Sequence, residues 1–185
     1  MTEARIDRAL APLIRCGAQT YGEAITQYAH AVQCAQLARE HGCGQAMIAA
    51  ALLHDVGQFL GDAGNAAEAE GRDGLHEETG AAFLRHFFGP EVTEPVRLHV
   101  AAKRYLCAAD PDYRADLSDA SELSLQLQGG PMSAAECAGF ESNPFFADAV
   151  LLRRFDDAGK RPDWAVPPLE SYRGMLRELL QPELA

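Results

Sequence analysis

The sequence lacks several features that would place the protein in familiar classes. It has no run of about 18 apolar residues, so it predicts no membrane-spanning helix. Only 16 Lys and Arg residues stand against 27 Asp and Glu residues, which gives a net charge of −11. Because nucleic-acid binding needs clustered basic residues, we expect neither nucleic acid nor a membrane as a partner. An anionic substrate would need local positive charge, which bound metal ions can supply.

Paired cysteines are also missing. The five cysteines are an odd set without a CxxC pair, and this pattern predicts neither a disulfide framework nor a thiolate metal site. We expect them to be buried thiols of a cytoplasmic protein. The opening segment MTEARIDRAL has no apolar core of the kind found in signal peptides, which agrees with a cytoplasmic location.

What the sequence does contain is helical patterning. The chain has 185 residues, of which 48% are hydrophobic, and this fits one compact all-α domain over residues 1–185. No segment alternates like a strand. Residues 44–60 are apolar almost all round, which predicts a central buried helix, and residues 61–74 are expected to be a mobile loop. The helices are predicted at 3–16, 21–40, 44–60, 75–88, 92–107, 117–128, 133–140, 144–156 and 169–181.

An adjacent His54 and Asp55 lie inside the apolar stretch AAALLHDVGQ. Burying both side chains is costly unless they are paired, hydrogen-bonded or bound to a metal ion. Taken alone, the dipeptide fits a satisfied core histidine equally well. Other histidines and one aspartate lie in segments predicted to pack around this helix: His30, His76, His99 and Asp156. His41 and His86 have polar surroundings and are predicted to lie on the surface.

These six side chains predict a metal site with more than one ion. A single structural zinc ion takes four ligands, and a mixed set of imidazoles and carboxylates suits iron, manganese or zinc. One carboxylate can bridge two ions. Asp55 has candidate ligands for both ions around it, so it is the predicted bridge.

The order His…His-Asp…Asp, with His54 standing 24 residues after His30, resembles the HD-domain superfamily. The two further histidines resemble its di-metal branch. This resemblance implies an HD-domain helical bundle whose metal-binding core covers residues 21–160. It also implies a distribution of ligands, with the first metal held by His30, His54, Asp55 and Asp156, and the second by Asp55, His76 and His99.

Several stretches are similar to a narrower group, the mixed-valent di-iron phosphonate oxygenases: YGEAITQYAH, HVAAKRYL, LSDAS, LQGGPM and FDDAGK. The similarity implies an enzyme that uses two iron ions, Fe(II)/Fe(III), and O2 as co-substrate. It would cleave the C–P bond of a small organophosphonate, 1-hydroxy-2-aminoethylphosphonate or its N-trimethyl analogue. The products would be phosphate and glycine or glycine betaine. No obligate protein partner is evident, and the amine substitution and oligomeric state are left open.

Two other functions remain compatible with this sequence. A metal-dependent HD phosphohydrolase acting on a phosphate ester or nucleotide would use the same ligands, so the ligands alone do not separate the two reactions. A non-catalytic module that binds a nucleotide is the third possibility. It has no evident need for a complete ligand set, which makes it the weakest of the three.

Helical spacing also predicts a phosphonate-binding wall. Lys103 stands four residues after His99, on the same helical face, where its positive charge suits a phosphonate oxygen. Ser121 and Gln128 are seven residues apart and share a face, and the resemblance places both at the phosphonate. Arg104 turns away from this face and is expected to be structural.

A second polar face precedes the His-Asp pair. Glu23, Gln27, His30 and Cys34 lie three or four residues apart, so they share one side of the predicted helix. Glu23 is predicted to hold a substrate ammonium group or to orient a ligand, and Gln27 to line the same pocket. Glu23 and Lys103 are the predicted catalytic residues.

Aromatic residues near this face could surround a trimethylammonium group through cation–π attraction. Tyr28 is predicted to bind substrate in this way, with Tyr21 and Phe59 nearby, although packing in the core is the commoner role of such residues. The resemblance leads us to expect an aromatic gating residue three positions before Glu23, where this chain has Thr20. Whether Tyr21 gates the O2 site is therefore left open.

Overall fold

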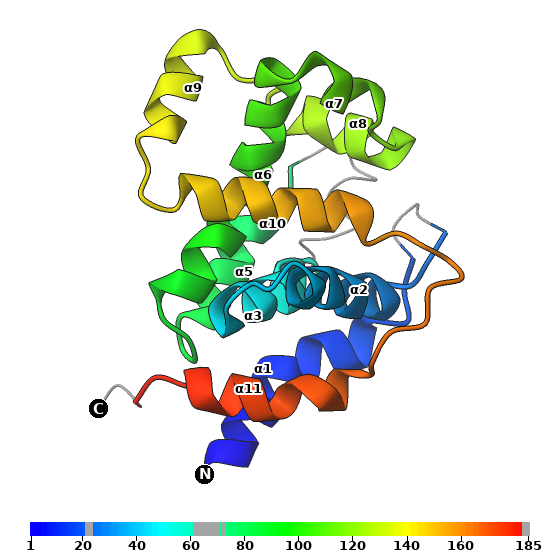
Figure 1. The fold of residues 1–185 in the computed structure, drawn as a ribbon, viewed down its shortest axis with the longest axis vertical. Helices are drawn as coiled ribbons and strands as arrows, with labels where there is room; N and C mark the ends of the chain where they lie inside the picture. The colour runs from blue at the N-terminus through cyan, green and yellow to red at the C-terminus, as the bar shows by residue number, and fades with distance from the viewer. Residues whose placement is uncertain (21–23, 61–70, 72, 183–185) are drawn as a thin grey trace.

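The structure is a computed structural model that describes residues 1–20, 24–60, 71 and 73–182. Every regular element within these residues is a helix, as predicted (Figure 1). In chain order the elements are α1 (Thr2–Cys16), α2 (Gln27–Glu40), α3 (Gln45–Leu53), the 3-10 helix η1 (Val56–Phe59), α5 (His76–Leu84), α6 (Pro90–Ala109), α7 (Pro111–Ala115), α8 (Asp119–Leu127), α9 (Ala134–Glu141), α10 (Phe146–Ala158), the 3-10 helix η2 (Leu169–Tyr172) and α11 (Arg173–Leu179).

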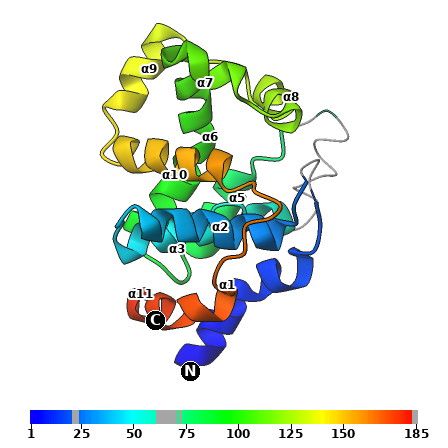
Figure 2. The same ribbon diagram turned by 45° about the vertical axis from the view of Figure 1, so that its right-hand side comes forward.

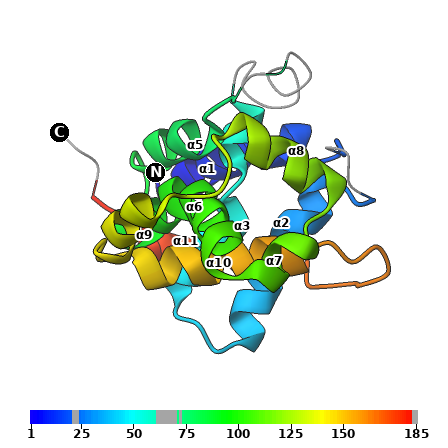
Figure 3. The same ribbon diagram turned by 90° about the horizontal axis from the view of Figure 1, so that it is seen from above.

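The helices form layers around α2 and α3. These two helices pack together in the middle of the molecule, and α6 and α10 pack against each other and against α3 (Figure 1). Helices α1 and α11 lie at one end, while α7, α8 and α9 lie at the other (Figure 2). Seen from above, α10 crosses beside α6, which also packs on α7 and α9 (Figure 3). The main apolar core extends from α1 to α11, and a smaller cluster joins α6, α9 and α10.

The predicted central helix is buried, but it is shorter than predicted. Helix α3 ends at Leu53, and the chain continues through a turn into η1. The backbone of Asp55 has φ −93° and ψ 8°, outside the α-helical region. Gly57 allows η1 to approach α5 closely, because a Cβ there would lie 1.9 Å from the carbonyl oxygen of His76. The turn after α3 therefore leads into a direct backbone contact between η1 and α5.

Other helix boundaries also differ from the prediction. Helix α2 begins at Gln27 rather than near residue 21, because the Thr26 side chain caps it and accepts a hydrogen bond from the Ala29 N–H at 3.2 Å. Helix α7 was not predicted. Its start is also capped by a side chain, since the carboxylate of Asp110 accepts a hydrogen bond from the Tyr113 N–H at 3.3 Å. The last predicted helix, 169–181, is divided into η2 and α11.

The cysteines are free thiols, as expected. Their expected burial holds for Cys34 and Cys107 and is wrong for Cys16, Cys43 and Cys137, which are partly exposed. These three lie at a helix end, in a connection and on the outlying α9, where less of the chain covers them. Among the described residues, no helix is long and apolar enough to span a membrane.

Candidate metal centre and adjoining pocket

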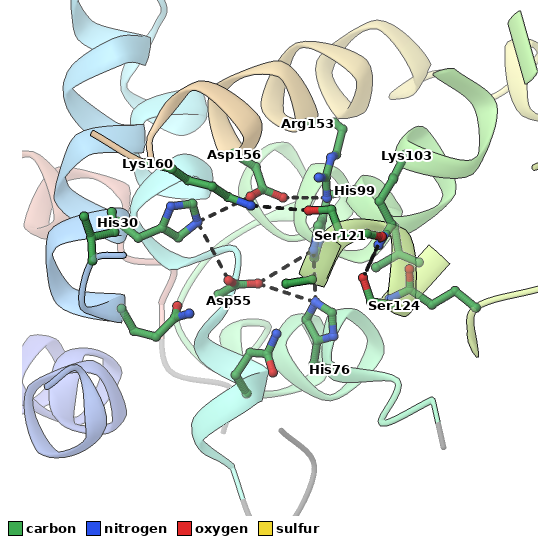
Figure 4. Close-up of a pocket in the computed structure, with 16 residues that line it drawn as sticks. His30, Asp55, His76, His99, Lys103, Ser121, Ser124, Arg153, Asp156 and Lys160 are labelled. Carbon is green, nitrogen blue, oxygen red and sulfur yellow. Dashed lines mark hydrogen bonds and ion pairs between the residues drawn. The ribbon is translucent and has the colours of Figure 1, made fainter. Parts of the chain in front are cut away.

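The six predicted ligands meet in one region of the fold, although they come from five parts of the chain. Figure 4 shows all of them except His54. α2 carries His30, and the turn between α3 and η1 carries His54 and Asp55. α5 begins with His76, α6 carries His99 near its middle, and α10 carries Asp156 near its end. Packing of α3 against α2, α6 and α10 brings these side chains together.

One half of the centre has two imidazoles and two carboxylates. The Nε2 atoms of His30 and His54 are 3.2 Å apart. Asp156 Oδ1 lies 3.4 Å from the first of these atoms and 3.8 Å from the second. Asp55 Oδ2 lies 3.8 Å from His30 Nε2 and 3.6 Å from His54 Nε2. Imidazole nitrogens and carboxylate oxygens thus converge as the predicted first metal requires.

The other half uses the second oxygen of the same carboxylate. The Nε2 atoms of His76 and His99 are 3.1 Å apart. Asp55 Oδ1 lies 3.4 Å from His76 Nε2 and 3.8 Å from His99 Nε2. Asp55 therefore presents one oxygen to each pair of histidines. This arrangement fits the predicted bridge, and the three residues could hold a metal ion by themselves.

Backbone carbonyls orient three of the imidazoles. The Nδ1–H groups of His30, His54 and His99 donate to the carbonyl oxygens of Gly159, Ala51 and Val96, at 2.9, 2.9 and 2.6 Å. A carbonyl can only accept, so the proton is on Nδ1 and the lone pair of Nε2 faces the centre. Such outer hydrogen bonds are typical of metal-binding histidines.

The electrostatics of the metal-free centre show how strongly it attracts positive charge. Burial disfavours the charged form of His54, but the carboxylates of Asp55 and Asp156 outweigh it and raise the pKa of His54 to about 9. Burial, together with His76 and His54, lowers the pKa of His99 to about 3. Burial opposes ionisation of Asp55, yet His54 and His76 hold its pKa well below the ordinary value. The centre therefore combines ionised carboxylates with imidazoles that compete for protons, a donor set that fits metal cations.

Cys34 approaches the first half of the centre without the properties of a ligand. Its Sγ lies 3.7 Å from His30 Nδ1 and 3.8 Å from His30 Nε2, so it forms a possible metal-binding group with His30 and His54. The thiol instead donates to the carbonyl oxygen of Phe155 at 3.4 Å. Burial and the nearby carboxylates raise the pKa of this thiol well above its ordinary value. The thiol thus faces a carbonyl oxygen, whereas Asp156 Oδ1 faces both imidazoles, which makes Asp156 the better fourth donor.

A pocket opens beside the metal centre (Figure 4). Most of its walls are polar, and several are charged. The residues that line it are Ile25, Gln27, His30, Asp55, Gln58, His76, His99, Val100, Lys103, Ala120, Ser121, Ser124, Gln128, Arg153, Asp156 and Lys160. Four predicted substrate residues are in this set: Gln27, Lys103, Ser121 and Gln128. Five of the six predicted ligands, all but His54, therefore share one cavity with these residues.

The pocket wall formed by α6 and α8 carries buried polar groups. Lys103 is only 3% exposed, and its Nζ donates to Ser124 Oγ at 2.8 Å. The side-chain oxygens of Gln27 and Gln128 are buried and have no hydrogen-bond partner among the described residues. Unpaired buried polar atoms are costly. Their presence in this cavity suits a polar ligand that would complete their hydrogen bonding.

Seven of the pocket residues were not predicted, and for three of them, Arg153, Lys160 and Ser124, the sequence contained signals. Arg153 stands three residues before Asp156 on α10, and Lys160 stands four residues after it, just beyond the end of this helix. Ser124 stands three residues after Ser121. The Nζ of Lys160 donates to Ser121 Oγ at 3.4 Å, so a second cation adjoins the predicted phosphonate wall.

Two of the aromatic residues predicted to surround a trimethylammonium group, Tyr28 and Phe59, lie elsewhere. Tyr28 is half-buried against the main core, and its hydroxyl accepts from the Leu169 N–H at 3.1 Å. Phe59 is buried in that same core. Neither is among the residues that line the pocket. Glu23 and Tyr21 lie outside the described residues, as does most of the predicted loop 61–74.

Three predictions about residues away from the centre are confirmed. His41 and His86 are exposed. Arg104 has a structural role, because its Nε donates to the carbonyl oxygen of Gly130 at 2.8 Å and its guanidinium pairs with Glu136 at 2.8 Å. The positive backbone φ of Gly130, +72°, places that carbonyl at the turn after α8.

Comparison with known proteins places the chain in a family. The family model described as HD domain matches residues 28–126. Hydroxymethylphosphonate dioxygenase of Gimesia maris is 48% identical over 168 residues, which cover 89% of this chain and 83% of that protein. The [1-hydroxy-2-(trimethylamino)ethyl]phosphonate dioxygenase (glycine-betaine-forming) of Leisingera caerulea is 43% identical over 167 residues, covering 90% of this chain and 85% of that protein. An uncharacterised protein of Acanthamoeba polyphaga mimivirus is 35% identical over 167 residues, covering 89% and 76%. The chain belongs to the HD-domain family and, within it, to the group that contains these phosphonate dioxygenases.

Proposed function

We propose that this chain is a di-iron dioxygenase that cleaves the C–P bond of a 1-hydroxyphosphonate with O2. The observation that carries the proposal is the position of Asp55, whose two oxygens face two separate pairs of histidines beside a pocket with buried cations. The names of the two dioxygenase relatives supply the reaction class. Both relatives are similar over most of this chain, including the segments that carry all six ligands.

The reaction balances with O2 as the sole oxidant. The C–P bond breaks, the carbinol carbon gains one oxygen atom to become a carboxylate, and phosphorus gains the other to become phosphate. One proton is released. The two iron ions would supply O2 binding and electron transfer, a role that a zinc ion cannot fill because it has no redox chemistry. We assign His30, His54, Asp55 and Asp156 to one ion and Asp55, His76 and His99 to the other.

The protein's own side chains would bind and orient the phosphonate. Lys103 brings positive charge to Ser124 and Lys160 brings it to Ser121, and the buried side-chain oxygen of Gln128 adds another polar group. Hydrogen bonds between charged partners are the stronger kind, and burial reduces the screening by water. This wall would hold the phosphonate while its C1 hydroxyl faces the metals.

The two relatives support a 1-hydroxyphosphonate as substrate, and they differ in whether the substrate carries an amine on a second carbon. The two relatives are named for substrates that share the 1-hydroxyphosphonate group, but only one of these substrates carries a trimethylamino group. No phenylalanine, tyrosine or tryptophan side chain lines this pocket within the described part of the chain. The residue predicted to hold an ammonium group, Glu23, lies outside that part. A substrate with an amino or trimethylamino group thus remains a prediction from the sequence.

The test is to measure O2 uptake and phosphate release together, using iron-loaded protein. The substrates compared are hydroxymethylphosphonate, 1-hydroxy-2-aminoethylphosphonate and its N-trimethyl analogue. We expect one phosphate for each O2 consumed with at least one of them. Phosphate release from a phosphate ester without O2 consumption, and no uptake with any phosphonate, would instead establish a phosphohydrolase.

A further inference from the structure

A buried ion network lies behind the ligand Asp156. Arg153 is only 4% exposed, and its Nη1 lies 2.7 Å from Asp156 Oδ2. Its other nitrogens contact Asp157 and Tyr113: Nη2 pairs with Asp157, and Nε donates to the Tyr113 hydroxyl at 3.0 Å. The Tyr113 hydroxyl donates in turn to Asp157 Oδ2 at 2.6 Å. One guanidinium thus joins a metal ligand to two residues outside the centre.

The two carboxylate oxygens of Asp156 have different partners. Oδ1 faces His30 and His54, whereas Oδ2 is paired with Arg153 (Figure 4). A carboxylate free to rotate could offer both oxygens to one ion. The guanidinium occupies one of them, and its planar fork fixes the plane of the pair as a lysine could not. Asp156 is therefore held with a single oxygen toward the metal centre.

The residues that hold Arg153 connect the centre to the pocket wall. Tyr113 lies on the short helix α7, which leads directly into α8 with Ser121 and Ser124. Burial and the adjacent Asp157 carboxylate raise the pKa of the Tyr113 hydroxyl well above its ordinary value, so this group remains a hydrogen-bond donor. Helix α7 therefore supports two features: Asp156, through Tyr113 and Arg153, and the wall on α8 that would bind the phosphonate.

We propose that Arg153 is a positioning residue that fixes Asp156 as a one-oxygen metal ligand, and that Tyr113 and Asp157 fix Arg153 in its turn. The proposal rests on the metal site of the proposed function, but it needs neither its substrate nor its use of O2. The sequence offers a matched control. Arg154 is the next residue on α10, yet its side chain is 52% exposed. Among the described residues its one ion pair is with Asp110, at 3.5 Å.

The first test is an anaerobic titration of the metal-free protein with iron(II), without substrate. In Arg153→Lys we expect one of the two ions to bind about 10- to 100-fold more weakly, the usual cost of losing an outer partner of a ligand. The other ion should bind as in the unchanged protein. Arg154→Lys should leave both affinities unchanged. Because no substrate is present, a failed oxygenase assay does not affect this result.

Two milder variants keep the test decisive if Arg153→Lys does not fold. Tyr113→Phe and Asp157→Asn each retain the pair between Arg153 and Asp156, and each should weaken the same ion by a smaller factor. Combining Tyr113→Phe with Arg153→Lys should weaken that ion little beyond Arg153→Lys alone. Unchanged iron affinities with only a lowered melting temperature would overturn the proposal. A raised KM for substrate with unchanged iron binding would also overturn it, because Arg153 would then be a substrate-binding residue.

Discussion

The metal centre and the pocket wall opposite it are held in different ways. At the centre, backbone carbonyls orient His30, His54 and His99 through their Nδ1–H groups. On the wall, side chains bond mainly to other side chains, as Lys103 does to Ser124 and Lys160 does to Ser121. The helices therefore preset the positions of the ligands, whereas the wall groups can exchange their partners for a bound anion. Changes in the two regions should have separable effects.

The largest expected effect comes from removing the shared carboxylate. Asp55→Ala takes away the group that faces both pairs of histidines, so we expect loss of both metal ions and of measurable turnover. Metal content of the purified variant measures this directly. Asp148→Ala, at an exposed position of α10, is the control and should keep a full load. A full load in Asp55→Ala would show that Asp55 does not bridge.

Backbone contact at Gly57 provides the next test of the preset centre. A Cβ there would lie 1.9 Å from the carbonyl oxygen of His76 and 2.7 Å from the Gly80 nitrogen, so Gly57→Ala must move η1 away from α5. We expect about 1–3 kcal/mol less stability, as for other overpacked sites, and weaker binding of the ion at His76. Urea unfolding and metal titration measure the two effects. Gly139→Ala has open space around its Cβ and should not destabilise the chain.

On the wall, Lys103→Met should separate substrate binding from metal binding. A hydrogen bond to a charged group contributes about 1.5–3 kcal/mol, so we expect a rise of roughly 10- to 150-fold in the KM for the phosphonate. Iron content should stay at the level of the unchanged protein. Ser124→Ala removes the partner of Lys103 but no charge, and its effect should be smaller. Loss of iron from Lys103→Met would mean that the wall and the centre are not independent.

The two regions also differ in how far the sequence predicted them. The ligands were found because His54 and Asp55 are polar residues in an apolar helix, and because their order resembles a known family. Helical spacing placed Lys103 beside the predicted metals and the resemblance placed Ser121 at the phosphonate, and both residues line the pocket. The conformation of Asp55 could not be predicted in this way. It leads into the contact of η1 with α5, which joins distant parts of the chain and leaves no periodic pattern.

Helical spacing did not predict which other part of the chain a given side chain packs against. Tyr28 lies next to the pocket residue Gln27 along α2, but it turns into the core and bonds to the backbone of Leu169. Arg153 and Lys160 lie close to Asp156 along the chain, and they were missed because charged residues near a helix end usually face solvent. Their burial is decided by α7 and α8, and α7 was itself not predicted.

The pH dependence of stability again distinguishes the centre from the rest of the molecule. In the metal-free protein the pKa of His54 is raised to about 9 from an ordinary value near 6.5. A group with a raised folded-state pKa stabilises the fold fully below its unfolded pKa, and this contribution is lost as the pH rises through the folded value. We therefore expect the metal-free protein to lose stability between about pH 6.5 and pH 9. The metal-loaded protein should lose much less, since the ion replaces that proton on Nε2. Urea unfolding across this range, with and without a chelator, measures the difference, and parallel curves would show that protonated His54 does not stabilise the empty centre.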